Sequence, residues 1–114
     1  MDAVKNDVKR LVKIELAAAN RKNRMFASTH EGAGVIQEEV KEADDEMTAL
    51  RRELNALWMG VYTNESPIST KQVYDTAVRL AVEAIQVVAM ARKFERSQRR
   101  NWPGAKERSY GEEK

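Results

Sequence analysis

The chain has 114 residues, of which 42% are hydrophobic and 33% are charged, a balance typical of one folded domain of modest size. It contains no cysteine, so disulfide bonds, thiolate metal sites and cysteine nucleophiles are excluded. The net charge of +2 is unevenly distributed: residues 1–30 carry +4 (7 basic, 3 acidic), residues 31–91 carry −6 (5 basic, 11 acidic) and residues 92–114 carry +4 (8 basic, 4 acidic). An acidic middle repels phosphate, so the charge distribution argues against a nucleic-acid-binding protein.

The N-terminal sequence "MDAVKNDVKR" is too highly charged for a signal peptide. No apolar run approaches the roughly 20 residues that a membrane-spanning helix needs. The 2 prolines and 5 glycines are few enough for a soluble helical protein. We therefore expect a cytoplasmic protein that makes no contact with a membrane.

Two helices are predicted in the first half of the chain. Apolar residues at helical spacing favour an amphipathic helix over residues 2–22. Ser28, followed three positions later by Glu31, forms a capping box, in which the hydroxyl and the carboxylate bind free backbone amides at a helix start. The second helix begins there and extends for about thirty residues, or about 45 Å. Its apolar residues alternate at steps of four and three, as on a helix packed lengthwise against others: Ile36, Val40, Ala43, Met47, Leu50, Leu54, Leu57 and Val61. Trp58 is also expected inside the bundle.

The third helix is predicted over residues 70–97, with Ser69 and Gln72 capping its start. It is apolar on two faces, which indicates a central position or a contact between subunits. The length of the second helix also exceeds what a compact monomer of this size needs, so partners along it are expected. The expected fold class is therefore all-α: an antiparallel bundle of three main helices completed by dimerisation. Residues 1–100 would form its single domain, and residues 101–114 a flexible tail.

Charged residues of the stretch "QEEVKEADDEM" fall into two groups on a helical wheel. Glu39, Glu42 and Glu46 follow one another at steps of three and four along one edge of the apolar seam, where another helix should pack. Carboxylates clustered in this way repel one another unless a cation or a basic partner neutralises them. The other group points away from the seam and is expected to form a solvated face: Glu38, Lys41, Asp44 and Asp45.

Glu83 is the only charged residue of the stretch "LAVEAIQVVAMA", and Gln86 is its only other polar residue. A lone carboxylate among apolar residues requires a partner. One candidate is Arg79, one turn earlier on the same helix. The other is a shared Mg²⁺ site, in which Glu83 and Gln86 face the acidic edge of the second helix, since Mg²⁺ favours carboxylate and amide oxygens.

The sequences "HEGAGVIQEEVKEADDEM" and "AVEAIQVVAMARKF" resemble the all-α nucleotide pyrophosphohydrolases of the MazG-like superfamily, which includes the dimeric dUTP pyrophosphatases. The likeness covers roughly residues 28–95 and is greatest to the short single-domain versions associated with phages and prophages. It implies a four-helix bundle that forms a dimer or a dimer of dimers. It also implies cleavage of a nucleoside triphosphate to the monophosphate and pyrophosphate, with Mg²⁺ as the cofactor and Mn²⁺ as an alternative ion.

The family's ExxE and ExxD pairs imply roles for particular residues. The ExxE pair matches Glu39 and Glu42, and the ExxD pair matches Glu83 and Gln86, so the resemblance implies metal binding at these four positions. Gln86 brings an amide oxygen in place of the carboxylate of Asp, which leaves weaker metal binding, an altered substrate or loss of catalysis as open alternatives. One further carboxylate, Glu38 or Glu46, would orient or deprotonate the attacking water. Three basic residues could reach the phosphates: Lys22, Arg24 and Arg79.

A second interpretation is a non-catalytic helical module. A degenerate family member could bind a protein or a nucleic acid through its basic ends, and the uncharged side chain of Gln86 favours this interpretation. The acidic cluster opposes it, because such a cluster is costly without a cation. No feature of the sequence identifies the nucleotide that an enzyme of this type would take.

Overall fold

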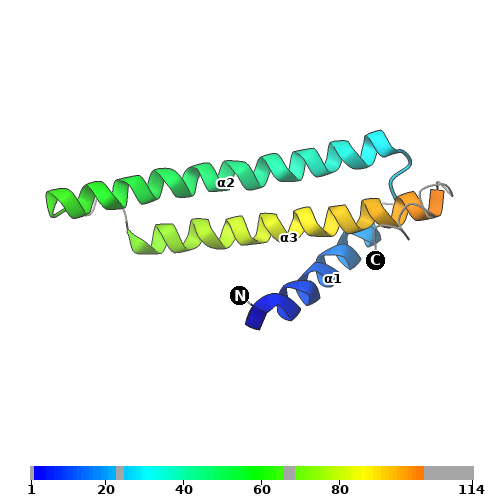
Figure 1. Ribbon diagram of the computed structural model, residues 1–114, viewed down its shortest axis with the longest axis horizontal. Helices are drawn as coiled ribbons and strands as arrows, with labels where there is room; N and C mark the ends of the chain where they lie inside the picture. Colours follow the sequence, from blue (N-terminus) through cyan, green and yellow to red (C-terminus); the bar gives the residue numbers. More distant parts are fainter. Residues whose placement is uncertain (1, 23–24, 66–68, 102–114) are drawn as a thin grey trace. The chain divides into compact units, whose positions relative to one another are not determined.

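A computed structural model describes residues 2–22, 25–65 and 69–101 of the chain, and within these residues the protein is all-helical, without strands. A short 3₁₀ helix, Asp2–Val4, is followed by α1 (Lys5–Lys22), α2 (Thr29–Thr63) and α3 (Thr70–Asn101), as labelled in Figure 1. The prediction of three main helices is confirmed. The expected tail lies outside the described residues, apart from its first residue. None of the described helices combines the length and the apolar character needed to cross a membrane.

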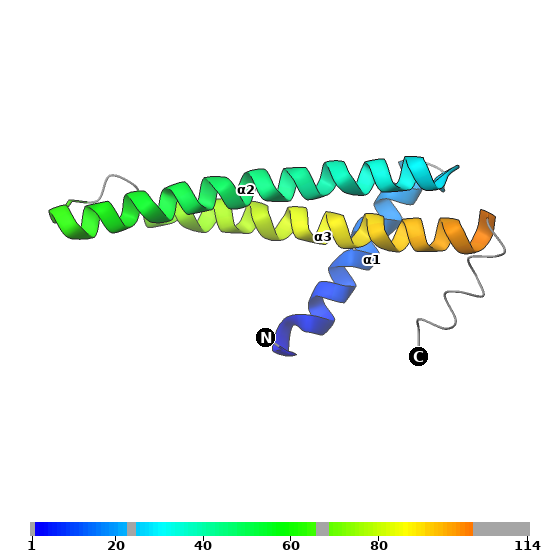
Figure 2. The ribbon, with the colours of Figure 1, turned by 45° about the horizontal axis from the view of Figure 1, so that its top comes forward.

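The chain divides into two compact units. Residues 39–84 form one unit, in which α2 and α3 lie side by side and antiparallel (Figures 1 and 2). The other unit contains α1, the start of α2 and the end of α3. Its buried core joins α1 to α3 and comprises Val12, Leu16 and Ala89, with Ile85 and Met90 packed against them.

Side chains cap the starts of the two long helices as their sequences indicate. The backbone N–H of Glu31 donates to Ser28 Oγ at 3.0 Å. The other half of the capping box is shifted by one residue, because Glu31 Oε1 accepts from the N–H of Ala27 at 3.2 Å. At α3, the N–H of Gln72 donates to Ser69 Oγ at 3.1 Å. Each hydroxyl accepts from a backbone amide in the first turn of its helix, so the helix starts are fixed locally.

The apolar seam predicted for α2 is buried only in part, since five of its eight residues are half-buried: Ile36, Ala43, Met47, Leu50 and Leu57. Three residues of the predicted seam are substantially exposed: Val40 at 49%, Leu54 at 46% and Val61 at 61%. Trp58, expected in the interior, is 53% exposed, so this prediction is wrong for the isolated chain. The buried residues of α2 are Gly32, Glu53 and Gly60, and together with the half-buried Glu39 and Glu46 they recur every seven residues. Small and polar side chains therefore occupy the inward line, and the apolar residues flank it.

Candidate metal centre

Three carboxylates from two helices come together within the unit of residues 39–84. Glu39 and Glu42 lie on α2, and Glu83 lies on α3. One carboxylate oxygen of each residue lies within 4.8 Å of those of the other two. Glu39 and Glu83 are half-buried, and Glu42 is exposed. The structure thus brings together three of the four residues that the sequence resemblance implies as metal ligands.

Helical spacing explains why these side chains meet. Glu39 and Glu42 are three residues apart on α2 and therefore share one face of that helix. Glu39 also belongs to the seven-residue repeat of inward positions on α2. Because α3 runs antiparallel to α2 in this unit, Glu83, near the end of the unit's α3 segment, lies at the level of Glu39, where the unit's α2 segment begins. The site is built on two helices, which fixes its ligands more firmly than loops would.

The environment of Glu83 disfavours its ionised form. Burial is the largest cause that raises the pKa of the Glu83 carboxyl above its ordinary value. A hydrogen bond between the side chains of Glu83 and Glu42 raises this pKa further, as do the negative charges of Glu42, Glu39 and Glu46. A divalent cation bound among these oxygens would reverse the effect, since it stabilises the ionised carboxylates.

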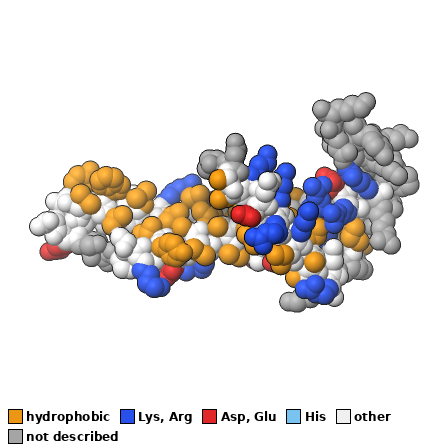
Figure 3. Space-filling model, turned by 90° about the horizontal axis from the view of Figure 1, so that it is seen from below, with side chains coloured by type: hydrophobic (Ala, Val, Ile, Leu, Met, Phe, Trp, Pro, Cys, Tyr) orange, Lys and Arg blue, Asp and Glu red, His pale blue; other side chains and the backbone are white. Residues whose placement is uncertain are grey.

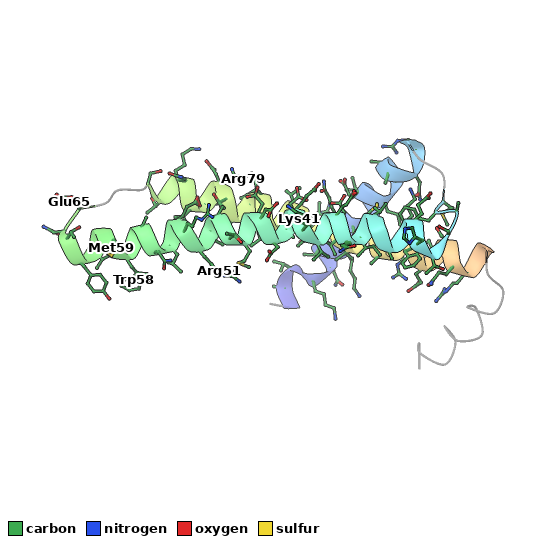
Figure 4. All side chains as sticks on the ribbon, turned by 90° about the horizontal axis from the view of Figure 1, so that it is seen from above. Lys41, Arg51, Trp58, Met59, Glu65 and Arg79 are labelled. Atoms are coloured by element: carbon green, nitrogen blue, oxygen red, sulfur yellow. The ribbon has the colours of Figure 1, made fainter. Side chains whose placement is uncertain are left out.

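Glu46, the fourth residue of the acidic edge, makes an ion pair with Arg79. The Nε–H of Arg79 donates to Glu46 Oε2 at 3.1 Å. Arg79, labelled in Figure 4, is the residue that the sequence offered as a partner for Glu83, and it neutralises a neighbouring carboxylate instead. Glu46 is close enough to raise the pKa of Glu83, so this ion pair lies beside the three-carboxylate cluster.

The remaining candidate residues lie elsewhere in the described chain or outside it. Gln86 is half-buried on α3, three residues after Glu83, and Glu38 is exposed on α2. Lys22 is the last residue of α1, and its side chain, like the whole of Arg24, lies outside the described part of the structure.

The charged face predicted for α2 is confirmed. Glu38, Lys41, Asp44 and Asp45 are all exposed. Lys41 Nζ donates to Asp45 Oδ2 at 3.1 Å, and the two side chains are 75% and 64% exposed. An exposed pair of this kind contributes little to stability. These residues therefore need no role beyond solvation of the helix.

Sequence reasoning missed two buried polar residues, Glu53 on α2 and Thr76 on α3. Glu53 is 8% exposed and Thr76 is fully buried, and Thr76 Oγ1 donates to Glu53 Oε2 at 2.7 Å. The signal that could have found them is the spacing. Glu53 follows Glu46 by seven residues, and Thr76 precedes Glu83 by seven, so each falls on the same helix face as a residue already singled out.

Comparison with known proteins identifies no relative: no family model, no curated protein and no solved structure matches this chain. The resemblance to the MazG-like superfamily therefore rests on the sequence motifs alone. The carboxylate cluster is a separate observation, made from geometry, and the proposed function depends on both.

Proposed function

We propose that this protein is a Mg²⁺-dependent nucleoside triphosphate pyrophosphohydrolase of the MazG-like type. The observation that carries the proposal is the convergence of Glu39, Glu42 and Glu83 to within 4.8 Å. Oxygen ligands held about 2.1 Å from an octahedral Mg²⁺ lie about 3 to 4 Å apart, so small side-chain rotations would bring the three carboxylates onto one ion. Ion binding would also relieve the repulsion that raises the pKa of Glu83.

The chemistry requires little beyond positioning and charge neutralisation. A water oxygen bonds to phosphorus while the bond between the α- and β-phosphates breaks, which yields a nucleoside monophosphate and pyrophosphate. A Mg²⁺ ion held there would supply the positive charge that offsets the charge developing at phosphorus. Glu39, Glu42 and Glu83 would hold the ion, and Gln86 would add an amide oxygen.

The proton of the attacking water needs an acceptor, and Glu38 and Glu46 are the two candidates. Glu46 Oε2 already accepts a hydrogen bond from Arg79 at 3.1 Å, so this oxygen is engaged in the ion pair. Glu38 is exposed and directly precedes Glu39 on α2. The ion pair therefore favours Glu38 as the general base and leaves Glu46 to hold Arg79.

Pyrophosphate release from a panel of standard and modified nucleoside triphosphates tests this function. The wild-type protein should release pyrophosphate when Mg²⁺ or Mn²⁺ is present and not when chelator is added. Glu39→Gln should abolish the release, because the metal loses a charged ligand. Asp45→Asn is the matched control, since Asp45 is an exposed acidic residue of the same helix. Turnover by Glu39→Gln at the wild-type rate would refute the assignment of the site.

We also propose that two copies of the chain associate through the apolar side chains that the isolated chain leaves exposed. Among the described residues, few apolar side chains are buried, while large ones on all three helices are exposed. Figure 3 shows hydrophobic side chains gathered over the end of the unit that contains the α2–α3 connection. Trp58 and Tyr62, with ring centroids 6.3 Å apart, belong to this exposed set and are 53% and 78% exposed. Apolar surface of this kind marks an interface.

Analytical ultracentrifugation of the wild-type protein should therefore show a dimer or a dimer of dimers. Trp58→Glu should shift the sedimentation toward the monomer, because a charge would be buried in the interface. Arg51→Glu serves as the control, since Arg51 is exposed on the same helix and is already charged (Figure 4). A monomeric wild type at micromolar concentration would contradict the proposal.

The alternative is a non-catalytic helical module that binds a protein or a nucleic acid. The specific observation in its favour is Gln86, which supplies no charge where the related enzymes have Asp. Such a module would keep its fold without a cation and would release no pyrophosphate. The response of its stability to metal distinguishes the two functions.

A further inference from the structure

A chain of hydrogen bonds crosses from α2 to α3 beside the carboxylate cluster, within the unit of residues 39–84. It begins at Glu53, whose Oε2 accepts from the hydroxyl of Thr76 at 2.7 Å. The same hydroxyl oxygen accepts from Arg79 Nη2–H at 2.8 Å. Arg79 Nε–H then donates to Glu46 Oε2 at 3.1 Å. Two carboxylates of α2 thus hold one guanidinium of α3, one of them directly and the other through a threonine.

The two ends of this chain differ sharply in exposure. Thr76 is fully buried and Glu53 is 8% exposed, while the side chain of Arg79 is 56% exposed. Within the described part of the chain, Glu53 Oε1 is also buried and has no hydrogen-bond partner. A buried carboxylate with one unsatisfied oxygen is a costly way to join two helices, since an apolar pair would serve as well. Its geometry suits a different purpose, which is to fix the guanidinium at the surface.

Arg79 keeps donors available for an anion. A guanidinium has five N–H donors. The hydrogen bonds of Arg79 to Glu46 and Thr76 use the Nε–H and one Nη2–H, which leaves the second Nη2–H and both hydrogens on Nη1. A pair of parallel N–H donors matches two oxygens of one phosphate group. Arg79 also lies one turn from Glu83 on α3, so an anion that it binds would lie beside the metal cluster.

We propose that Arg79 binds the phosphate chain of the substrate and that Thr76 and Glu53 are positioning residues that hold its guanidinium in place. This inference rests on the proposed function, because it assigns the triphosphate of the same substrate to a residue beside the metal ligands. The Thr76 hydroxyl oxygen accepts from Arg79 Nη2–H and so orients that edge of the guanidinium. Glu53 accepts the hydroxyl hydrogen, which leaves the lone pairs of the hydroxyl oxygen directed at Arg79. Neither positioning residue touches the substrate.

A purely structural ion pair makes a different prediction. If Arg79 only neutralises Glu46, the loss of the Thr76 hydroxyl leaves the ion pair intact and changes stability alone. If Arg79 binds phosphate, the same loss frees the guanidinium to rotate and weakens phosphate binding as well. Affinity for a polyphosphate therefore separates the two roles.

The test measures the binding of inorganic tripolyphosphate to the full-length protein by isothermal titration calorimetry, with Mg²⁺ present. Arg79→Gln should weaken binding by about tenfold or more, the size expected when a hydrogen bond to a charged group is lost. Thr76→Val removes the hydroxyl at nearly constant shape and should weaken binding several-fold, to about a third or less of the wild-type affinity. Thr76→Ser restores the hydroxyl and should restore affinity. Wild-type affinity in a folded Thr76→Val protein would overturn the inference.

A second variant and a second readout keep the result interpretable. Where Thr76→Val fails to fold, Glu53→Gln carries the test, since it keeps the shape and weakens the bond to Thr76; unchanged tripolyphosphate affinity then overturns the inference. Mn²⁺ binding without phosphate, followed by electron paramagnetic resonance, should be the same in the wild type and in all these variants. Absence of Mn²⁺ binding in the wild type refutes the proposed function, whereas tripolyphosphate binding that still depends on Thr76 and Arg79 supports the phosphate site on its own.

Discussion

Replacement of Gly32 by alanine is expected to lower the free energy of unfolding by about 2 kcal/mol. Gly32 is buried on α2, and a Cβ atom there would meet the ring of Phe94 on α3, with Phe94 Cε1 at 2.7 Å, Cγ at 2.9 Å and Cδ1 closer still. These separations are well inside van der Waals contact, so either the ring or the helix must move. Overpacking costs about 1 to 3 kcal/mol, and separations this short place the cost near the upper end, against which alanine returns up to about 1 kcal/mol of helix propensity.

The ring of Phe94 has little room to yield. It packs edge-on against Phe26, with ring centroids 6.3 Å apart at an angle of 71°. Phe26 is itself 5% exposed, and its backbone N–H donates to the buried Ser97 Oγ at 3.0 Å. The Nζ of Lys93 lies 4.8 Å from the centroid of the Phe26 ring on the same unit. A shift of Phe94 would therefore disturb its edge-on contact with Phe26, a ring that the hydrogen bond and the cation–π contact hold in place.

Gly34 supplies a matched control on the same helix, two residues further on. A Cβ atom at Gly34 would meet nothing within 4 Å, and the residue is exposed. Gly34→Ala should therefore stabilise the protein by up to about 1 kcal/mol through helix propensity alone. Urea unfolding of both variants, followed by circular dichroism, measures the difference of about 3 kcal/mol that the two effects imply. Equal stability of the two alanine variants would contradict the packing of α2 against Phe94.

The helices could be predicted from the sequence because their signals are local. The hydroxyls of Ser28 and Ser69 bind the amides of Glu31 and Gln72, three residues away, so the contact needs no tertiary structure. Apolar periodicity likewise depends on neighbours within two turns. These signals located the starts of α2 and α3 to within about a residue.

The packing of the helices could not be predicted in the same way. A helical wheel shows which residues share a face, but not which neighbour that face meets. The apolar series that contains Val40, Leu54 and Val61 was assigned to the interior, yet these residues are exposed in the isolated chain. The inward line instead carries Glu46 and Glu53, which hydrophobic pattern alone assigns to solvent. Apolar periodicity cannot distinguish a face buried within one chain from a face that a second copy would cover.

Part of the candidate site could be predicted, for a reason that is also local. Glu39 and Glu42 share a helix face by spacing, and Glu83 stands out as a carboxylate within an apolar stretch. That these three residues meet is a tertiary fact, which the structure supplies. The bond between Glu53 and Thr76 joins residues 23 positions apart on different helices, and the bond between Arg79 and Glu46 joins residues 33 apart, so no local pattern encodes either contact.

Saturating Mn²⁺ or Mg²⁺ is expected to raise the melting temperature of the wild-type protein by about 10 °C. A ligand at a hundredfold excess over its Kd adds about 2.7 kcal/mol to stability, and for a chain of this size each kcal/mol shifts the melting temperature by about 4 °C. Glu39→Gln and Glu83→Gln should each abolish the rise, since both side chains belong to the three-carboxylate cluster. Asp45→Asn, on the exposed face of α2, should respond as the wild type does.

Without metal, the carboxylate of Glu83 should lower the stability of the folded protein, and this effect should depend on pH. The pKa of Glu83 in the folded protein is raised above the ordinary value of 4.5, so the folded state binds this proton more tightly than the unfolded state does. Its contribution to stability is present below that ordinary pKa and is lost as pH rises through the raised one. Without metal, Glu83→Gln should therefore be more stable than the wild type at about pH 8 and lose less stability between about pH 5 and pH 8.

Melting curves at these two pH values, with and without Mn²⁺, separate the two candidate functions. An enzyme that keeps three carboxylates for a cation is destabilised by them until the ion binds. The Glu83→Gln variant should therefore be more stable without metal and should no longer be stabilised by Mn²⁺. In a module that uses no metal, no ion would offset the repulsion among the three carboxylates. Identical pH dependence in the wild type and Glu83→Gln, together with no response to Mn²⁺, would remove the physical basis of the hydrolase proposal, because the carboxylates would then neither repel one another nor hold an ion.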